Sequence, residues 1–126
     1  MQLQHIDHIA ITVSDLQRSI TWYRDVLGLE RRFQEAWGDV PTMMCVRETC
    51  VALFVSDRPD RGAVEQPATG SLHHIAFRVD RDNFEAAQRR FRDLGIEFRP
   101  ADHGIAQSVY VADPDGHRIE ITTYDV

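Results

Sequence analysis

The hydrophobic pattern of the chain occurs twice. Segments 8–13 (HIAITV) and 74–79 (HIAFRV) alternate between apolar and less apolar side chains, which is typical of a β-strand with one buried face. Successive side chains of a strand point to opposite faces, so the larger apolar residues share one face and the leading histidine lies on the other. His8 and His74 hold the same position in the two segments. We therefore predict two equivalent strands, each with a histidine on its less apolar face.

A helical pattern follows each predicted strand. Apolar residues recur every three or four positions across 16–27 and again across 84–94, which favours a helix with one apolar stripe. Ser14 and Asp82 are the N-caps that we expect, because their side-chain oxygens can accept hydrogen bonds from the free N–H groups of the first turn. A glycine follows each stripe and suits the position just beyond a helix.

Shorter strands follow each predicted helix. We place three in each half, at 31–37, 42–47 and 50–56, and at 97–100, 108–112 and 118–124. The order is then β-α-β-β-β in both halves. This order predicts an α+β fold of two βαβββ modules, whose sheets are concave on the side away from the helices.

Residues 57–70 separate the two halves. The segment contains two prolines, two glycines and charges of both signs without apolar periodicity, which is typical of a linker. The 126-residue chain has the length of one domain. We therefore treat 1–126 as a single domain made of module 1 (1–56), this linker and module 2 (71–126).

The composition favours an ordinary soluble domain. Apolar residues make up 43% and charged residues 27% of the chain, and 14 basic against 20 acidic side chains give a net charge of −6. We expect no nucleic-acid or membrane partner, because these require a basic face or a long apolar segment. No signal peptide is visible, so we expect a cytoplasmic protein in which Cys45 and Cys50 are free thiols.

The equivalent histidines, His8 and His74, suggest a metal site. The pseudo-twofold relation of the two halves would bring both imidazoles to the concave side. Glu120 lies between two isoleucines of the last strand and faces the same side, where an unpaired carboxylate is costly to bury. The equivalent position in the first half is Ala52, which is no ligand. Two histidines and one carboxylate leave coordination positions open, as in catalytic zinc sites and non-haem Fe(II) sites.

The segment before Glu120 supplies two further candidates. Asp-Pro-Asp-Gly at 113–116 is a turn signal, because proline presets φ and glycine accepts a positive φ. If the strands pair directly across this turn, Tyr110 lies opposite Glu120, either as a substrate contact or as packing. His103 lies in the preceding loop as an acid–base candidate, although a loop histidine is more often solvated. We assign the other histidines, His5, His73 and His117, to structural or surface roles.

These residues resemble the vicinal oxygen chelate superfamily. The similarity lies in segments 8–16 (HIAITVSDL), 22–28 (WYRDVLG), 74–77 (HIAF) and 113–120 (DPDGHRIE), and it spans nearly the whole chain. The superfamily contains glyoxalase I, methylmalonyl-CoA epimerase, extradiol ring-cleaving dioxygenases, fosfomycin-resistance thiol transferases and bleomycin-resistance proteins. The resemblance implies the two-module fold, a metal site and a homodimer. It is less specific for the reaction, because one fold hosts many chemistries.

The members of the superfamily differ in the residues at these positions. Glyoxalase I and the epimerase have a fourth protein ligand where this chain has Ala52, and the bleomycin-binding members lack the metal ligands. The fosfomycin transferases share Ser108, Tyr110 and the Asp-Pro-Asp-Gly-His run, but carry Thr or Cys at the position of Ala10 and a basic residue beyond the glutamate. The dioxygenases share the order of His103, Tyr110, the turn and the glutamate, but have a further histidine ahead of the second module.

Our leading hypothesis is an extradiol-type dioxygenase in which His8, His74 and Glu120 hold the metal. The ion, Fe²⁺ or Mn²⁺ with Zn²⁺ or Ni²⁺ as alternatives, would chelate adjacent oxygens of a small catechol-type substrate, with Tyr110 and His103 as catalytic groups. A glutathione or other thiol transferase of the fosfomycin-resistance type, or a glyoxalase-like lyase, is the alternative enzyme. A non-catalytic protein that sequesters a small molecule is the alternative of another class.

Overall fold

The computed structural model describes residues 1–56 and 68–126. Most of the predicted linker, residues 57–67, lies outside these described residues. The chain divides into two compact units, unit 1 up to residue 60 and unit 2 from residue 61, and each is described by itself. Across the described residues, no helix is both long enough and apolar enough to cross a membrane.

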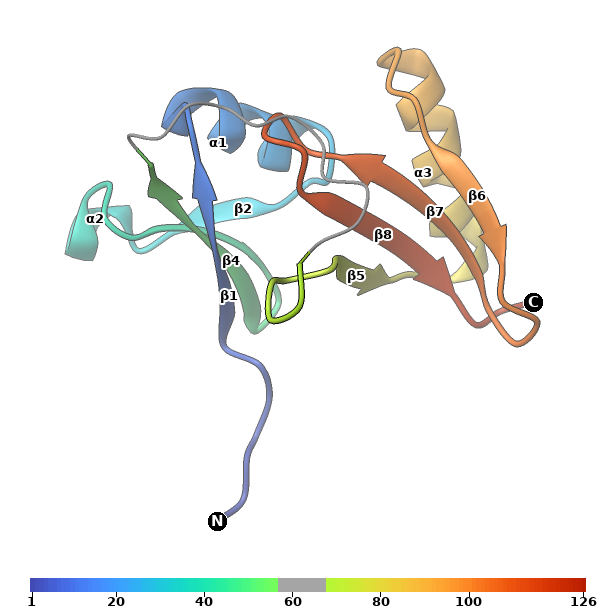
Figure 1. The fold of residues 1–126 in the computed structure, drawn as a ribbon, viewed down its shortest axis with the longest axis horizontal. Helices are drawn as coiled ribbons and strands as arrows, with labels where there is room; N and C mark the ends of the chain where they lie inside the picture. Colours follow the sequence, from blue (N-terminus) through green and yellow to red (C-terminus); the bar gives the residue numbers. More distant parts are fainter. Residues whose placement is uncertain (57–67) are drawn as a thin grey trace. The chain divides into compact units, whose positions relative to one another are not determined.

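Unit 1 contains a four-stranded sheet and its helices (Figure 1). Its elements are β1 (His8–Val13), α1 (Leu16–Asp25), β2 (Glu30–Arg32), α2 (Gln34–Trp37), β3 (Thr42–Val46) and β4 (Thr49–Val55). The strand order is β1-β4-β3-β2, in which β1 runs parallel to β4 and the other pairs are antiparallel.

The second strand of unit 1 is shorter than the sequence predicts. We expected one strand across 31–37, but β2 ends at Arg32 and residues 34–37 form the short helix α2. Phe33 lies between them with a φ of 66°, in the left-handed region that an extended strand cannot contain. The prediction of a strand is therefore wrong beyond Arg32.

Unit 2 repeats the same arrangement. Its elements are β5 (Ile75–Arg78), α3 (Arg81–Asp93), β6 (Arg99–Asp102), β7 (Gln107–Ala112) and β8 (Arg118–Thr123). The strand order β5-β8-β7-β6 matches that of unit 1 position by position, again with one parallel pair, β5 with β8. The α+β class and the two βαβββ modules are thus confirmed.

In each unit the long helix covers the apolar face of the sheet. Tyr23 of α1 and Phe91 of α3 are 0% and 1% exposed, and the two helices contact β4 and β8 respectively. Strand residues on this face, such as Leu53 and Ile119, are buried as well. Side chains that alternate with them, including Glu120, therefore lie on the opposite face of their sheet.

Aspartates cap both long helices, at Asp15 and Asp80 rather than at the expected Ser14 and Asp82. Each carboxylate accepts a hydrogen bond from the backbone N–H three residues further on, at 3.0 Å and 2.8 Å. A negative charge also interacts favourably with the positive end of the helix dipole, which a serine hydroxyl does only weakly. Asp82 lies within the first turn of α3.

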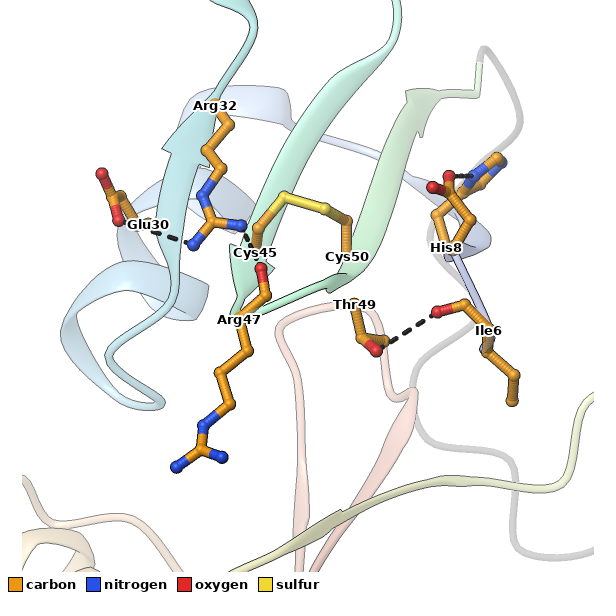
Figure 2. The surroundings of a disulfide bond; sticks show 9 residues. Ile6, His8, Glu30, Arg32, Cys45, Arg47, Thr49 and Cys50 are labelled. Atoms are coloured by element: carbon orange, nitrogen blue, oxygen red, sulfur yellow. Dashed lines mark hydrogen bonds and ion pairs between the residues drawn. A yellow bond between two sulfur atoms is a disulfide. The ribbon is translucent and has the colours of Figure 1, made fainter. Parts of the chain in front are cut away.

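Cys45 and Cys50 form a disulfide (Figure 2), so the expectation of free thiols is wrong. The two residues are direct partners in the antiparallel register of β3 and β4, with their Cα atoms 4.0 Å apart. Residues 47 and 48 form the turn between the strands, and Arg47 there has a φ of 51°. Directly opposed side chains of an antiparallel pair share one face, so the hairpin brings the two sulfurs together.

Replacing Phe91 by alanine should lower the free energy of unfolding by about 3–5 kcal/mol, because the lost ring leaves a cavity between α3 and its sheet. Leu94, at the C-terminal end of the same helix and 48% exposed, provides the matched control. Leu94→Ala should cost less than about 1 kcal/mol. Chemical denaturation followed by circular dichroism measures both variants, and equal losses would contradict the packing of α3.

Candidate metal centre

Glu120 is a buried carboxylate on the face of β8 that turns away from α3. It is 7% exposed, and its strand neighbours on either side, Ile119 and Ile121, belong to the apolar face. The Ser108 hydroxyl donates a hydrogen bond to Oε1 of Glu120 at 2.5 Å. The Ser108 and Thr122 hydroxyls lie 2.9 Å apart. These contacts compensate part of the cost of removing the carboxylate from water.

His74 supplies the second polar contact of this carboxylate. Nε2 of His74 lies 2.9 Å from Oε2 of Glu120. The contact is a hydrogen-bonded ion pair. Two ligands that bind one ion at right angles with bonds of about 2.1 Å lie about 3.0 Å apart, so the same separation is compatible with a shared divalent ion. The nitrogen and oxygen donors also suit Fe²⁺, Mn²⁺ and Zn²⁺. The pair therefore fits a metal ion.

His73 holds the other side of the His74 ring. The Nδ1 atoms of the two histidines lie 2.8 Å apart, with one imidazole donating to the other. A metal-ligating histidine commonly has its second nitrogen hydrogen-bonded, which fixes the orientation of the ring. We assigned His73 to a structural or surface role, because it matches Asp7 in the repeat and would lie on the helix-facing side or at a strand end. Residues 73 and 74 precede the first residue of β5, so alternation does not constrain them.

Tyr110 and His103 complete the polar cluster of unit 2. Tyr110 lies opposite Glu120 in the β7–β8 register, and this pairing confirms the predicted hairpin. Nε2 of His103 is 3.1 Å from the Tyr110 hydroxyl and 3.9 Å from Oε1 of Glu120. Sequence reasoning gave no role to Arg99, which lies opposite Tyr110 on β6 with its guanidinium 5.2 Å from the ring centre.

The surroundings of Tyr110 raise the pKa of its phenol above the ordinary value of 10.0. Burial is the largest cause, followed by the negative charge of Glu120 and hydrogen bonding to it, whereas Arg99 and Arg118 oppose the shift. The phenol therefore keeps its proton throughout the neutral range. Tyr110 can donate a hydrogen bond to an oxygen that gains negative charge.

His8 belongs to unit 1, where it begins β1. Its Nδ1 lies 2.7 Å from Oδ2 of Asp7. The register confirms that Ala52 is the counterpart of Glu120, because Ala10 pairs with Ala52 as Ala76 pairs with Glu120. Within the described residues of either unit, no three His, Cys, Asp or Glu side chains form a metal-binding group. The predicted ligand set spans both units, so its assembly stays a prediction.

The chain is similar in sequence and in fold to known proteins. The family model described as the Glyoxalase/Bleomycin resistance protein/Dioxygenase superfamily matches residues 5–121. The chain is 31% identical to the glutathione transferase FosA of Serratia marcescens, over 94% of this chain and 80% of that protein. It is 29% identical to the metallothiol transferase FosB of Staphylococcus epidermidis, over 98% and 84%. A crystal structure of a glyoxalase/dioxygenase from Nostoc punctiforme superposes with a TM-score of 0.80 at 23% identity, covering 95% of this chain and 90% of that one.

The match to a dioxygenase covers a smaller share of the relative than the matches to the two transferases do. The catechol-2,3-dioxygenase of Bacillus subtilis is 26% identical over 93% of this chain, but only 40% of that protein is covered. The two transferases instead match over most of their own length.

Replacing Arg99 by glutamine should raise the pKa of Tyr110 further, because the variant removes a cation that favours the phenolate. Ultraviolet titration of metal-free protein measures the change, with Tyr110→Phe identifying the signal of this phenol. Arg92, whose guanidinium lies over the Phe98 ring at 5.5 Å, gives a matched control. Arg92→Gln should leave the titration unchanged, and a lower Tyr110 pKa in Arg99→Gln would contradict the electrostatic account.

Proposed function

Because the chain belongs to the Glyoxalase/Bleomycin resistance protein/Dioxygenase superfamily, we propose that it is a metal-dependent enzyme that acts on a small molecule. The observation that carries the proposal is the 2.9 Å approach of His74 Nε2 to Glu120 Oε2 in a buried, hydrogen-bonded setting. His8, from the equivalent position in the other module, would be the third ligand. Its imidazole would come from the same chain or from a second copy in a homodimer.

The proposed ligands leave positions free for the oxygens of a substrate. When bound there, a divalent ion supplies a Lewis acid that polarises a substrate oxygen. Ser108 holds the Glu120 carboxylate and His73 holds the His74 ring, so both proposed ligands are oriented by hydrogen bonds of 2.5 Å and 2.8 Å. Tyr110 would donate to the substrate oxygen that becomes negative, and His103 would exchange a proton with the Tyr110 hydroxyl.

The reaction that we propose first is the transfer of a small thiol to an electrophilic carbon that carries oxygen, such as an epoxide carbon. The relatives that match over most of their own length are a glutathione transferase and a metallothiol transferase. In this reaction a C–S bond forms, a C–O bond breaks, and the proton of the thiol ends on the released oxygen. Tyr110 is neutral because burial and Glu120 raise its pKa, and as a hydrogen-bond donor it would stabilise that oxygen.

Ring cleavage of a catechol-type substrate is the second candidate. The specific observation in its favour is the contact of 3.1 Å between His103 and Tyr110, which provides a proton-transfer pair beside Glu120. Both oxygens of a diol would be deprotonated in such a reaction. In this candidate, His103 would be the base and Tyr110 the hydrogen-bond donor.

Replacing His74 by alanine should weaken the binding of Mn²⁺ or Fe²⁺ by at least about 100-fold, because loss of an outer-shell partner alone costs about 10–100-fold. Isothermal titration calorimetry on anaerobic protein measures the affinity. His5→Ala is the control, since His5 is exposed and forms an ion pair with Glu48 at 3.5 Å. Equal affinities of wild type and His74→Ala would contradict the proposed site.

Two assays on the metal-loaded protein distinguish the reactions. For thiol transfer, we expect loss of glutathione or cysteine in the presence of an epoxide such as fosfomycin. For ring cleavage, we expect oxygen uptake with a catechol panel. Tyr110→Phe should lower kcat of the active assay by about 100-fold, in the range measured for loss of one oxyanion donor, and change KM little. If the protein is inactive in both assays, both proposed reactions are wrong. The metal site is tested separately by the affinity measurement on His74→Ala.

A further inference from the structure

The sheet of unit 1 carries a row of four reactive side chains on the face away from α1. His8 of β1 pairs with Cys50 of β4, Cys50 pairs with Cys45 of β3, and Cys45 pairs with Glu30 of β2. Paired residues of neighbouring strands point to the same face. The disulfide therefore lies in one line with His8 and Glu30, as Figure 2 shows.

The hairpin is held on both sides of the disulfide by contacts that do not need it. Met43–Ala52 and Val46–Thr49 continue the β3–β4 register on either side. Arg32, which forms an ion pair with Glu30 at 3.8 Å, donates a hydrogen bond to the carbonyl oxygen of Arg47 in the turn. Only four residues separate the cysteines, so the bond closes a short loop and restricts the unfolded chain less than a long-range bridge would. We therefore expect the hairpin to stay folded whether the two cysteines are oxidised or reduced.

The start of β4 is tied to the segment that leads into His8. The backbone N–H of Cys50 donates to the carbonyl oxygen of Asp7 at 2.9 Å. The Thr49 hydroxyl donates to the carbonyl oxygen of Ile6 at 3.2 Å. A movement at the start of β4 is thus passed directly to Ile6 and Asp7, the two residues that precede His8.

We infer that Cys45 and Cys50 are a redox-active pair that undergoes thiol–disulfide exchange with small thiols. A thiolate attacks the sulfur of Cys50, forms a mixed disulfide there and releases Cys45 as a thiolate. A second small thiol then attacks the mixed disulfide. The S–S bond of the pair is broken, two electrons and two protons pass to the cysteines, and one disulfide of the small thiol is formed. Oxidation by the small disulfide runs the same steps in reverse.

Both cysteines are buried, but Cys50 is less so, at 7% exposed against 1% for Cys45, so the attack is assigned to Cys50. Exchange requires access to one sulfur, so the start of β4 must open locally before the thiol attacks. Reduction replaces one S–S bond by two separate thiols, which need more room on the sheet face. The thiol of Cys50 then lies beside His8, so the redox state of the pair changes the surroundings of that imidazole.

Equilibration of the full chain with reduced and oxidised glutathione tests the inference. Acid quenching, alkylation with N-ethylmaleimide and intact mass spectrometry count the free thiols. We expect two species only, with no adduct and with two adducts. The reduced fraction should rise from below a tenth to above nine tenths over about a hundredfold change in the ratio of squared glutathione to glutathione disulfide.

Two results would overturn the inference. One is an unmodified protein at every ratio that yields two thiols only after denaturation, which would mark an inert structural bond. The other is two adducts at every ratio, including glutathione disulfide alone, which would mark free thiols that do not pair. Neither result depends on enzymatic activity, so failure of the proposed reaction and failure of this inference are distinguishable.

The single variants test which sulfur is attacked. Cys45→Ser leaves Cys50, which should form a mixed disulfide with glutathione, whereas Cys50→Ser leaves the more buried Cys45, which should stay unmodified. The opposite result would overturn the assignment to Cys50. In wild type, the imidazole NMR signals of His8 should shift between the two redox states, while those of His117 in unit 2 stay in place. Unchanged His8 signals would overturn the coupling to His8.

Discussion

The chemistry of unit 2 depends on one buried carboxylate. Glu120 is 7% exposed, and an ionised carboxylate at such a position is destabilising unless its oxygens have partners. Ser108 meets one oxygen and His74 the other. The Asp-Pro-Asp-Gly turn makes this possible, because Asp113 accepts hydrogen bonds from the backbone N–H groups of Asp115 and His117 and so fixes the register of β7 against β8. The apolar face of the sheet thus positions a polar site on its other face.

The two units share one topology but not one chemistry. At equivalent places in the sheets, unit 2 has the pair Ala76–Glu120 and unit 1 has the pair Ala10–Ala52. Unit 1 instead carries a disulfide beside its histidine. The two modules therefore share the strand order that buries the apolar face, while their opposite faces carry different side chains. In the proposed metal site, one carboxylate would complete a pair of histidines from equivalent positions.

Much of the fold could be predicted from the sequence, because alternation and helical spacing record which side chains are buried. The repeat predicts both modules, and the turn signal predicts that Tyr110 faces Glu120. The sequence does not reveal α2, since it depends on the left-handed conformation of Phe33. The disulfide was missed because free thiols were expected from the predicted compartment, and that argument ignores the direct β3–β4 pairing that brings Cys45 and Cys50 together. His73 was missed because alternation does not apply before the first residue of β5.

The proposed third ligand, His8, is assigned by the sequence pattern alone, through its equivalence with His74. The most direct measurement is a crystal structure of the metal-loaded protein with anomalous differences collected at the absorption edge of the metal. We predict one anomalous peak about 2 Å from donor atoms of His8, His74 and Glu120, with His8 from the same chain or a second copy. A peak away from these residues, or Glu120 bound only to Ser108 and His74 in metal-saturated crystals, would contradict the account.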